Sequence, residues 1–577
     1  DAQPVPNVVS LQQPAMDPVF RSRATADVLI TVANAAQPGR AAPADYRSWL
    51  LSRFPGGANA YTAALARGLT SGTIPRPAAR PTSEVTIPAP VEGEGDFFFV
   101  VYPSAVLGDD GANKPWLQEL PDPVSKVCWQ SWIEINPVTA EQLSIEQGDV
   151  LEIQGAGGTV RAPAYVYPGI RRDTVAMAFG RGHTAYGRYA KDVGANPLDA
   201  LSPGFDRAGL AAWSGSRVRV RKAGDYTQLV TTEGSARQHG RGIGRAVAVG
   251  ELGQTGAEHA AGHALPGDAS HEHLPGLRAP IAADAEGALQ DPKTNEVGMY
   301  DPNHPTGMAR RRWAMTIDLA RCTGCAACVT ACYAENNIPT VGAAYQSGHT
   351  QGLPRTAGAN ILRSREMAWI RIERYWEGDE TSPDFDTRFV PMLCQHCGNA
   401  PCEPVCPVFA TYHSPDGLNV QVYNRCVGTR YCSNNCPYKV RYFNWFGYGE
   451  TDRPQYAWPE PLNWQLNPDV TVRGKGVMEK CTFCVQRIRE AENRARAEGR
   501  EVEPNEFTVA CAQACPSRAI AFGDAADERW AVAGQLHDER AYHVFEELNT
   551  FTAVVYLKKV THPAPGAQPV AAPAAAH

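Results

Sequence analysis

"CTGCAACVTAC", residues 322–332, places four cysteines close together at C-x2-C-x2-C-x3-C spacing. This spacing is typical of bacterial ferredoxin loops, in which three thiolates wrap one iron–sulfur cubane. The fourth cysteine lies on the helix that follows the loop and ligates the other cluster of the pair. The stretch therefore predicts the start of a ferredoxin-like unit with paired clusters.

Three further cysteine groups follow the first one. They are "CQHCGNAPCEPVCP" (394–407), "RCVGTRYCSNNCPY" (425–438) and "CTFC" (481–484) combined with "CAQACP" (511–516). Zinc is the alternative, because C-x2-C pairs are common zinc knuckles. Structural zinc sites pair two such units at a distance, whereas here the cysteines crowd together and Cys-Pro closes three of the four groups. The pattern favours iron–sulfur clusters.

The third group has only three cysteines, and Thr429 stands where a further one is expected. The loop could be a damaged site, a site for a different metal, or a cluster built with three irons. A neutral hydroxyl is a poor iron ligand beside thiolates, and the rest of the loop is intact. We therefore expect a [3Fe–4S] cluster here.

Because the last cysteine of a group crosses to the neighbouring cluster, the 15 cysteines from Cys322 to Cys515 sort into four ligand sets. Three sets predict [4Fe–4S] clusters and the fourth predicts the [3Fe–4S] cluster. We name them set I (Cys322, Cys325, Cys328, Cys515), set II (Cys332, Cys481, Cys484, Cys511), set III (Cys394, Cys397, Cys402, Cys436) and set IV (Cys406, Cys426, Cys432).

Composition limits what the rest of the chain can be. A length of 577 residues predicts two to four domains. The net charge of −7 argues against nucleic-acid binding, which needs a concentrated basic surface. No apolar run reaches the roughly 18 residues of a membrane-spanning helix. The chain begins without an initiator methionine or signal peptide, so we expect it to start after a processing site or inside a longer protein.

The pattern along the chain predicts an α+β protein. Residues 96–222 contain short apolar segments punctuated by Gly, Pro and Asp, which predicts a β-barrel or sandwich. The expected divisions are an N-terminal region and join (1–95), the barrel (96–222), an extended linker (223–309), a tandem ferredoxin-like domain (310–560) and a disordered tail (561–577).

Several residues outside the cysteine groups are of types that can bind metals. Cys128 is a lone cysteine on a strand-like run, which favours a buried small hydrophobe. The predicted linker contains five histidines, but no cysteine or fixed helical spacing accompanies them, so a solvated linker is favoured over a metal site. These are His239, His259, His263, His271 and His273.

Residues 310–545 resemble the four-cluster electron-transfer subunits of molybdenum oxidoreductases of the dimethyl-sulfoxide-reductase and polysulfide-reductase type, notably in "IDLARCTGCAACVTACYAENNIP" and "ACAQACPSRAIAFGD". Residues 96–222 are similar to the pterin-binding C-terminal barrel of the catalytic subunits, notably in "WIEINPVTAEQLSIEQGDVLEI" and "GRGHTAYGRYAKDVGANPLDAL". This resemblance implies a double-psi barrel, with residues 1–95 a fragment of the same region and a linker. The fusion of both parts resembles the iron–sulfur subunit of alternative complex III.

That resemblance implies an electron-relay subunit of a quinol oxidoreductase, with no substrate site of its own, that passes electrons to cytochrome c or another periplasmic acceptor. The implied partners are a multi-spanning quinone-binding membrane subunit and c-type haem subunits, in a hetero-oligomeric complex at the periplasmic face of the bacterial inner membrane. The alternative is the relay of a molybdenum polysulfide- or thiosulfate-type reductase. Molybdopterin is not expected, so Gly180, Gly182, His183, Gly187 and Arg188 are interpreted as scaffold.

Aromatic residues and two cations gather in "PYKVRYFNWFGYG", residues 437–449, directly after set IV. Packing inside the cluster domain is one interpretation. Tyr, Trp and Arg are also enriched in interfaces, so we expect this segment to dock on the membrane subunit through Lys439 and Arg441.

Overall fold

The computed structural model describes residues 2–5, 8–11, 22–37, 43–54, 56–71, 94–253, 311–342 and 359–562, except for 109, 202–212, 214–215, 233, 380–384, 415 and 454. Four of the five histidines, most of the predicted linker and residues 563–577 lie outside this range. The chain divides into two units, Asp1–Ala89 and Pro90–His577. None of the helices within the described ranges has the length and apolar character needed to cross a membrane.

The first unit combines three helices with a small sheet. The helices are α1 (Thr25–Ala36), α2 (Tyr46–Arg53) and α3 (Gly57–Arg67), and the antiparallel strands are β1 (Ala2–Val5), β2 (Val8–Ser10) and β3 (Leu69–Ser71). Asp45 caps α2, because its side chain accepts a hydrogen bond from the Ser48 N–H at 2.6 Å.

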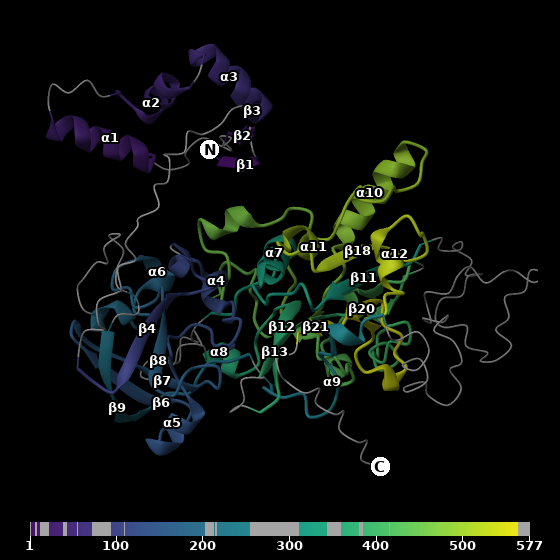
Figure 1. Ribbon diagram of the computed structural model, residues 1–577. Helices are drawn as coiled ribbons and strands as arrows, with labels where there is room; N and C mark the ends of the chain where they lie inside the picture. Colours follow the sequence, from purple (N-terminus) through teal and green to yellow (C-terminus); the bar gives the residue numbers. More distant parts are fainter. Residues whose placement is uncertain are drawn as a thin grey trace, which may run out of the picture. The chain divides into compact units, whose positions relative to one another are not determined.

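The predicted barrel is confirmed as a closed barrel in the order β4-β8-β5-β7-β6-β9 (Figure 1). Its strands are β4 (Phe97–Pro103), β5 (Ile133–Ile135), β6 (Asp149–Gly155), β7 (Gly158–Val166), β8 (Thr174–Phe179) and β9 (Ser216–Tyr226). Alternate residues such as Leu151 and Ile153 point into the barrel core. Strand β9 continues past the expected boundary at residue 222, because its end still pairs with β6. The double-psi type stays a prediction.

Part of the predicted linker is tied to the far end of the chain. Strand β10 (Ala246–Ala248) pairs in parallel with β21 (Lys559–Thr561). The described part of 223–309 thus returns to the cluster domain rather than running free. His239 lies here, and its Nε2 is 3.0 Å from the Ser235 hydroxyl.

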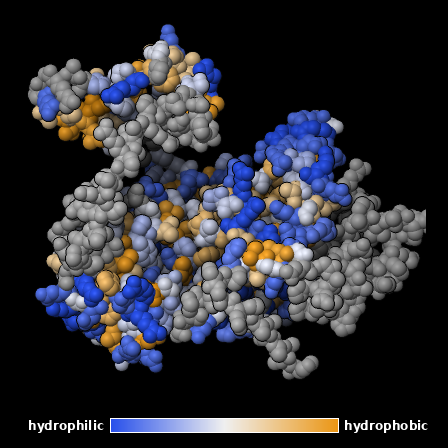
Figure 2. All heavy atoms as spheres, in the orientation of Figure 1, coloured by the Kyte–Doolittle hydropathy of each residue, from blue (hydrophilic) through white to orange (hydrophobic). Residues whose placement is uncertain are grey.

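The cluster domain is organised around a four-stranded sheet in the order β18-β11-β20-β19. Its other elements are short and alternate with cysteine loops. The elements used below are β11 (Trp313–Asp318), α7 (Ala327–Glu335), β12 (Ile370–Glu377), β13 (Asp386–Leu393), β14 (Thr411–His413), β15 (Asn419–Gln421), α9 (Tyr431–Asn434), α10 (Val485–Ala497), α11 (Ala510–Ala514), β18 (Ile520–Asp524), β19 (Ala541–Tyr542) and β20 (Val554–Leu557). Helix α10 lies between Cys484 and Cys511 of set II, and Figure 2 shows that its surface is strongly hydrophilic.

The barrel and the cluster domain share one hydrophobic core. Trp129 and Leu107 of the barrel side belong to the same buried cluster as Trp313 of β11. The joint also contains polar bonds, because Arg374 of β12 donates through Nε to the Val124 carbonyl at 2.7 Å. These two parts are therefore packed as one body.

Candidate iron–sulfur sites

The first and third cysteine loops have the same backbone conformation. Gly324 and Gly428 have φ angles of 73° and 74°, and the residues two positions later have φ angles of 60° and 63°. A helix follows in both cases, α7 in the first loop and α9 in the third. Thr429 therefore occupies the backbone position of Cys325. Cys325 and Thr429 are both exposed, so the two positions also agree in exposure.

The structure brings each predicted ligand set together. In set I, burial raises the pKa of the Cys328 thiol, and the three other thiols of the set raise it further. The same holds for Cys397 in set III. In set II the three partners of Cys511 raise its pKa after burial. In set IV burial raises the pKa of Cys432, and the other two cysteines of the set act in the same direction.

The four sets follow one another in the order I, II, III, IV. Cys511 of set II is close enough to Cys328 of set I to affect its pKa. Cys481 of set II is similarly close to Cys394 of set III. Sets II and III are buried throughout, whereas set I contains the exposed Cys325 and set IV has two half-buried cysteines. The row therefore reaches the surface at its two ends.

Buried thiols that crowd in this way fit iron–sulfur clusters. Burial and mutual repulsion both disfavour the thiolate form, so the arrangement is consistent with a cationic centre that holds the thiolates deprotonated. No three or more His, Cys, Asp or Glu side chains within the described ranges are arranged for a single metal ion. The two observations are compatible, because a cluster distributes its thiolates over several irons instead of one centre.

Backbone N–H groups also point at the thiolates that precede proline. The Ala410 N–H donates to Cys406 Sγ at 3.1 Å, and the Ala519 N–H donates to Cys515 Sγ at 3.2 Å. In both loops a residue with a φ of 52° turns the chain back toward the sulfur. Although burial acts in the opposite direction, such N–H groups lower the pKa of Cys406. The Cys-Pro loops are therefore built to stabilise a sulfur that carries negative charge.

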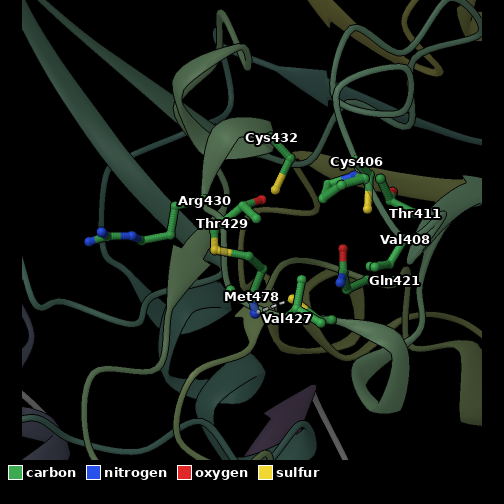
Figure 3. A pocket seen from close by; sticks show the side chains of 12 residues that line it. Cys406, Val408, Thr411, Gln421, Val427, Thr429, Arg430, Cys432 and Met478 are labelled. Carbon is green, nitrogen blue, oxygen red and sulfur yellow. Dashed lines mark hydrogen bonds between the residues drawn. The ribbon is translucent and has the colours of Figure 1, made fainter.

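Set IV borders a small surface cavity that is also lined by Thr429. Figure 3 shows the sulfur atoms of Cys406 and Cys432 facing this cavity, with the Thr429 side chain beside Cys432. The third sulfur, of Cys426, accepts a hydrogen bond from the Met478 N–H at 3.4 Å. Three thiols and one hydroxyl thus surround one space, which fits a cluster with three thiolate ligands.

Arg441 corrects the prediction of a docking segment at 437–449. Its side chain is only 4% exposed, and it lies between sets III and IV rather than on the surface. Tyr438, Tyr442 and Tyr448 are buried as well. The alternative interpretation, packing inside the cluster domain, is right for these four residues. Of the two predicted docking cations, only Lys439 is exposed.

Sequence reasoning also missed Asn336. Its Nδ2 lies 3.4 Å from Cys332 Sγ and 4.0 Å from Cys484 Sγ, so it donates toward two thiols of set II. The spacing of four residues after Cys332 on one helix face was a usable signal. The bond to Cys484 joins residues 148 positions apart and could not be read from the sequence.

The glycine-rich loop of the barrel is filled by the chain itself. A Cβ at Gly182 would lie 2.3 Å from the Asn196 N, and one at Gly187 would lie 2.2 Å from the Asn113 side chain. The Arg188 Nη2 donates to the Glu460 carbonyl at 3.2 Å. These residues therefore make close contacts within the chain, and the absence of molybdopterin stays a prediction. Cys128 is fully buried, as expected for a small hydrophobe.

Three family models match parts of the barrel region and of the cysteine region. Residues 120–207 match the molydopterin dinucleotide binding domain, and residues 321–410 and 385–450 match two families described as 4Fe-4S dicluster domains. The iron–sulfur cluster-binding subunit of menaquinone reductase from Nitratidesulfovibrio vulgaris is 40% identical over 253 residues, which is 43% of this chain and 89% of that protein.

Two further relatives cover a similar share of the chain. Iron–sulfur subunit 1 of the Hdr-like menaquinol oxidoreductase from Archaeoglobus fulgidus is 30% identical and matches 48% of this chain and 94% of its own length. A tetrathionate reductase subunit from Salmonella typhimurium is 31% identical and matches 42% of this chain and 69% of its own length.

Proposed function

Since the chain belongs to the family of iron–sulfur subunits of molybdopterin-oxidoreductase-type complexes, we propose that it is the relay subunit of a membrane quinol oxidoreductase of the alternative complex III type. The observation that carries this proposal is Thr429. It stands at the place of a cluster ligand in a loop that otherwise has the conformation of the first loop. The fusion of this unit to a barrel matched by the molydopterin dinucleotide binding domain supports it further.

The cysteines hold one-electron carriers in a row. We assign [4Fe–4S] clusters to sets I, II and III and a [3Fe–4S] cluster to set IV, and no molybdopterin to the barrel. Iron–sulfur clusters supply one-electron transfer when they are bound. Oxidation of one quinol releases two electrons and two protons. The protons are released to solvent at the quinol site of the donor subunit, and this chain carries the electrons one at a time from set IV to set I.

The surface around set IV carries exposed apolar side chains, which suit contact with the electron-donating partner. Large apolar side chains are exposed on both of its loops, and Val427 and Phe409 are 64% and 63% exposed. Tyr431 and Val408 are exposed on the same two loops, and Val408 lines one cavity together with Val427. Apolar and aromatic side chains that surround a polar site are typical of protein interfaces. We assign the contact with a multi-spanning quinone-binding subunit to these four residues, in place of the segment 437–449.

The acceptor side and the location follow from the resemblance alone. We place c-type haem subunits at the set I end and the whole complex at the periplasmic face of a bacterial inner membrane. A second candidate is the relay of a molybdenum reductase, in which electrons run in the opposite direction. The likeness to the tetrathionate reductase subunit favours this alternative.

Iron analysis and EPR of the purified complex test the proposal. Three complete sets and one incomplete set correspond to about 15 irons per chain, against about 16 if every cluster is complete. We expect the lower value together with the EPR signal of an oxidised [3Fe–4S] centre. A complex with the higher value and no such signal contradicts the assignment of set IV. Molybdenum and pterin analysis then separates the two candidates, because the second requires both in the complex.

The docking surface is tested separately. Replacing Val427 and Tyr431 by serine should release the membrane subunit while iron content stays at the wild-type level. The matched control is Leu143→Ser, because Leu143 is also exposed but lies on the barrel. If the double variant stays assembled and as active as the control, the docking surface lies elsewhere.

A further inference from the structure

Arg441 is a buried cation between the two cluster sites nearest the proposed electron donor. Its guanidinium is held in place by three hydrogen bonds to side chains of the β14–β15 pair. Nη1 donates to Gln421 Oε1 at 2.7 Å, and Nη2 donates to Thr411 Oγ1 at 2.7 Å and to Asn419 Oδ1 at 2.8 Å. A side chain fixed in this way keeps its charge at one position.

All three acceptors are neutral. In the described part of the chain, Arg441 forms no ion pair with a carboxylate. The acidic residue that comes nearest through this network is Glu403, which is hydrogen-bonded to Asn419. Glu403 pairs with His413 at 2.8 Å between Nδ1 and Oε1 and not with Arg441. The positive charge of Arg441 is therefore not cancelled within its own network.

The positive charge of Arg441 acts on thiols of sets III and IV. Arg441 interacts electrostatically with Cys402, Cys394 and Cys436 of set III and with Cys432 of set IV. Burial alone lowers the pKa of Arg441, but these thiols outweigh it and raise the pKa above the ordinary value for arginine. The guanidinium therefore stays charged under all conditions in which the complex operates.

We propose that Arg441 sets the reduction potentials of the clusters in sets III and IV together. The proposal rests on the cluster assignment made above. Adding one electron makes a cluster more negative by one charge, and a fixed cation in a low-dielectric interior stabilises that reduced form. Because one guanidinium acts on both sites, it raises both potentials in the same direction. The transfer between the two sites therefore stays close to balanced, while electrons are drawn from the donor.

Potentiometric EPR titration of the purified complex tests this role, with Arg441→Gln as the main variant. We expect the midpoint potentials of the clusters in sets III and IV to fall together. The expected size is at least a tenfold change in each reduction equilibrium, about 59 mV for a one-electron couple. Sets I and II should shift less, because they are farther from the lost charge.

Two controls separate the charge from the side chain. Arg441→Lys keeps a cation, so the potentials of sets III and IV should stay closer to the wild-type values than in Arg441→Gln. Lys439→Gln removes an exposed cation two residues away and should leave all potentials at the wild-type values, because solvent screens its charge. Equal potentials in Arg441→Gln and wild type overturn the proposal. So does an Arg441→Lys variant that shifts as far as Arg441→Gln.

A second variant covers the case in which Arg441→Gln loses iron. Gln421→Glu keeps the arginine and places a carboxylate against its Nη1, so both potentials should again fall with iron content unchanged. Unchanged potentials in a fully loaded Gln421→Glu complex overturn the proposal. Absence of a [3Fe–4S] signal in the wild type would instead contradict the assignment of set IV, and the potential of set III still tests Arg441.

Discussion

Replacing Thr429 by cysteine tests whether the third loop lacks only its fourth thiolate. The backbone is already in place, because Gly428 and Arg430 adopt the φ angles of the corresponding residues around Cys325. The new side chain is also similar in size to the old one. A cysteine at this position should therefore complete the ligand set without a rearrangement of the loop, and set IV should take up a [4Fe–4S] cluster.

The expected change is one iron atom per chain. Iron content should rise from about 15 to about 16 per chain, a gain of about 7%, because the corner iron gains its thiolate ligand. Iron analysis against protein measured by amino-acid analysis resolves this difference. EPR is more sensitive, because the signal of the oxidised [3Fe–4S] centre should disappear. Quinol oxidation should slow, because the cluster type helps to set the potential of the first acceptor.

Thr429→Ser is the matched control, since it removes a methyl group and adds no thiol. It should keep both the wild-type iron content and the EPR signal. A Thr429→Cys variant with wild-type iron, signal and turnover would refute the reasoning, because the cysteine would then not reach the cluster. Loss of iron in both variants would show that the loop itself is sensitive to substitution.

Three further changes test the framework around the clusters. Burial raises the pKa of Glu119 to about 7. Its contribution to the free energy of unfolding, about 3 kcal/mol, is therefore complete below pH 4.5 and is lost as the pH rises to about 7. Glu119→Gln should flatten the pH dependence of thermal stability in this window. Glu479→Gln leaves the fully buried Arg473 without its ion partner and should lower stability by about 3–5 kcal/mol, seen as a lower Tm of the complex. Gly428→Ala should prevent binding of the cluster in set IV and leave the other three sets loaded, because a Cβ there would lie 2.4 Å from the Gly476 carbonyl oxygen. An unchanged EPR signal would contradict this.

The cysteine sets could be predicted because their chemistry is local in sequence. In the first group only two residues separate neighbouring thiolates of one cluster, and this crowding distinguishes the site from other metal sites. The barrel could be predicted for a similar reason, since alternation along β6 places Leu151 and Ile153 on its inner face. The exact end of β9 could not, because pairing with β6 extends it beyond the apolar pattern.

The position of Arg441 could not be read from the sequence. A cation among aromatic rings has the same pattern in an interface and in a core. What decides between them is the presence of buried acceptors, and these come from β14 and β15, with Thr411 30 residues away along the chain. The same holds for the joint near Glu119, whose carboxylate accepts hydrogen bonds from an N–H group 222 residues later. Such contacts depend on the completed fold.

The four sets differ in burial: the two middle sets are buried, and the two end sets are partly exposed. Every cysteine of sets II and III is buried, so an electron there is shielded from solvent and from other acceptors. The exposed positions are Cys325 at the set I end and Thr429 at the set IV end, which are equivalent in the two loops. At one end a thiolate completes the set, and at the other a hydroxyl leaves it incomplete. Together with the buried Arg441, this difference distinguishes two ends that the fold makes alike. The backbone therefore does not distinguish the two ends of the row, whereas the side chains at set IV do.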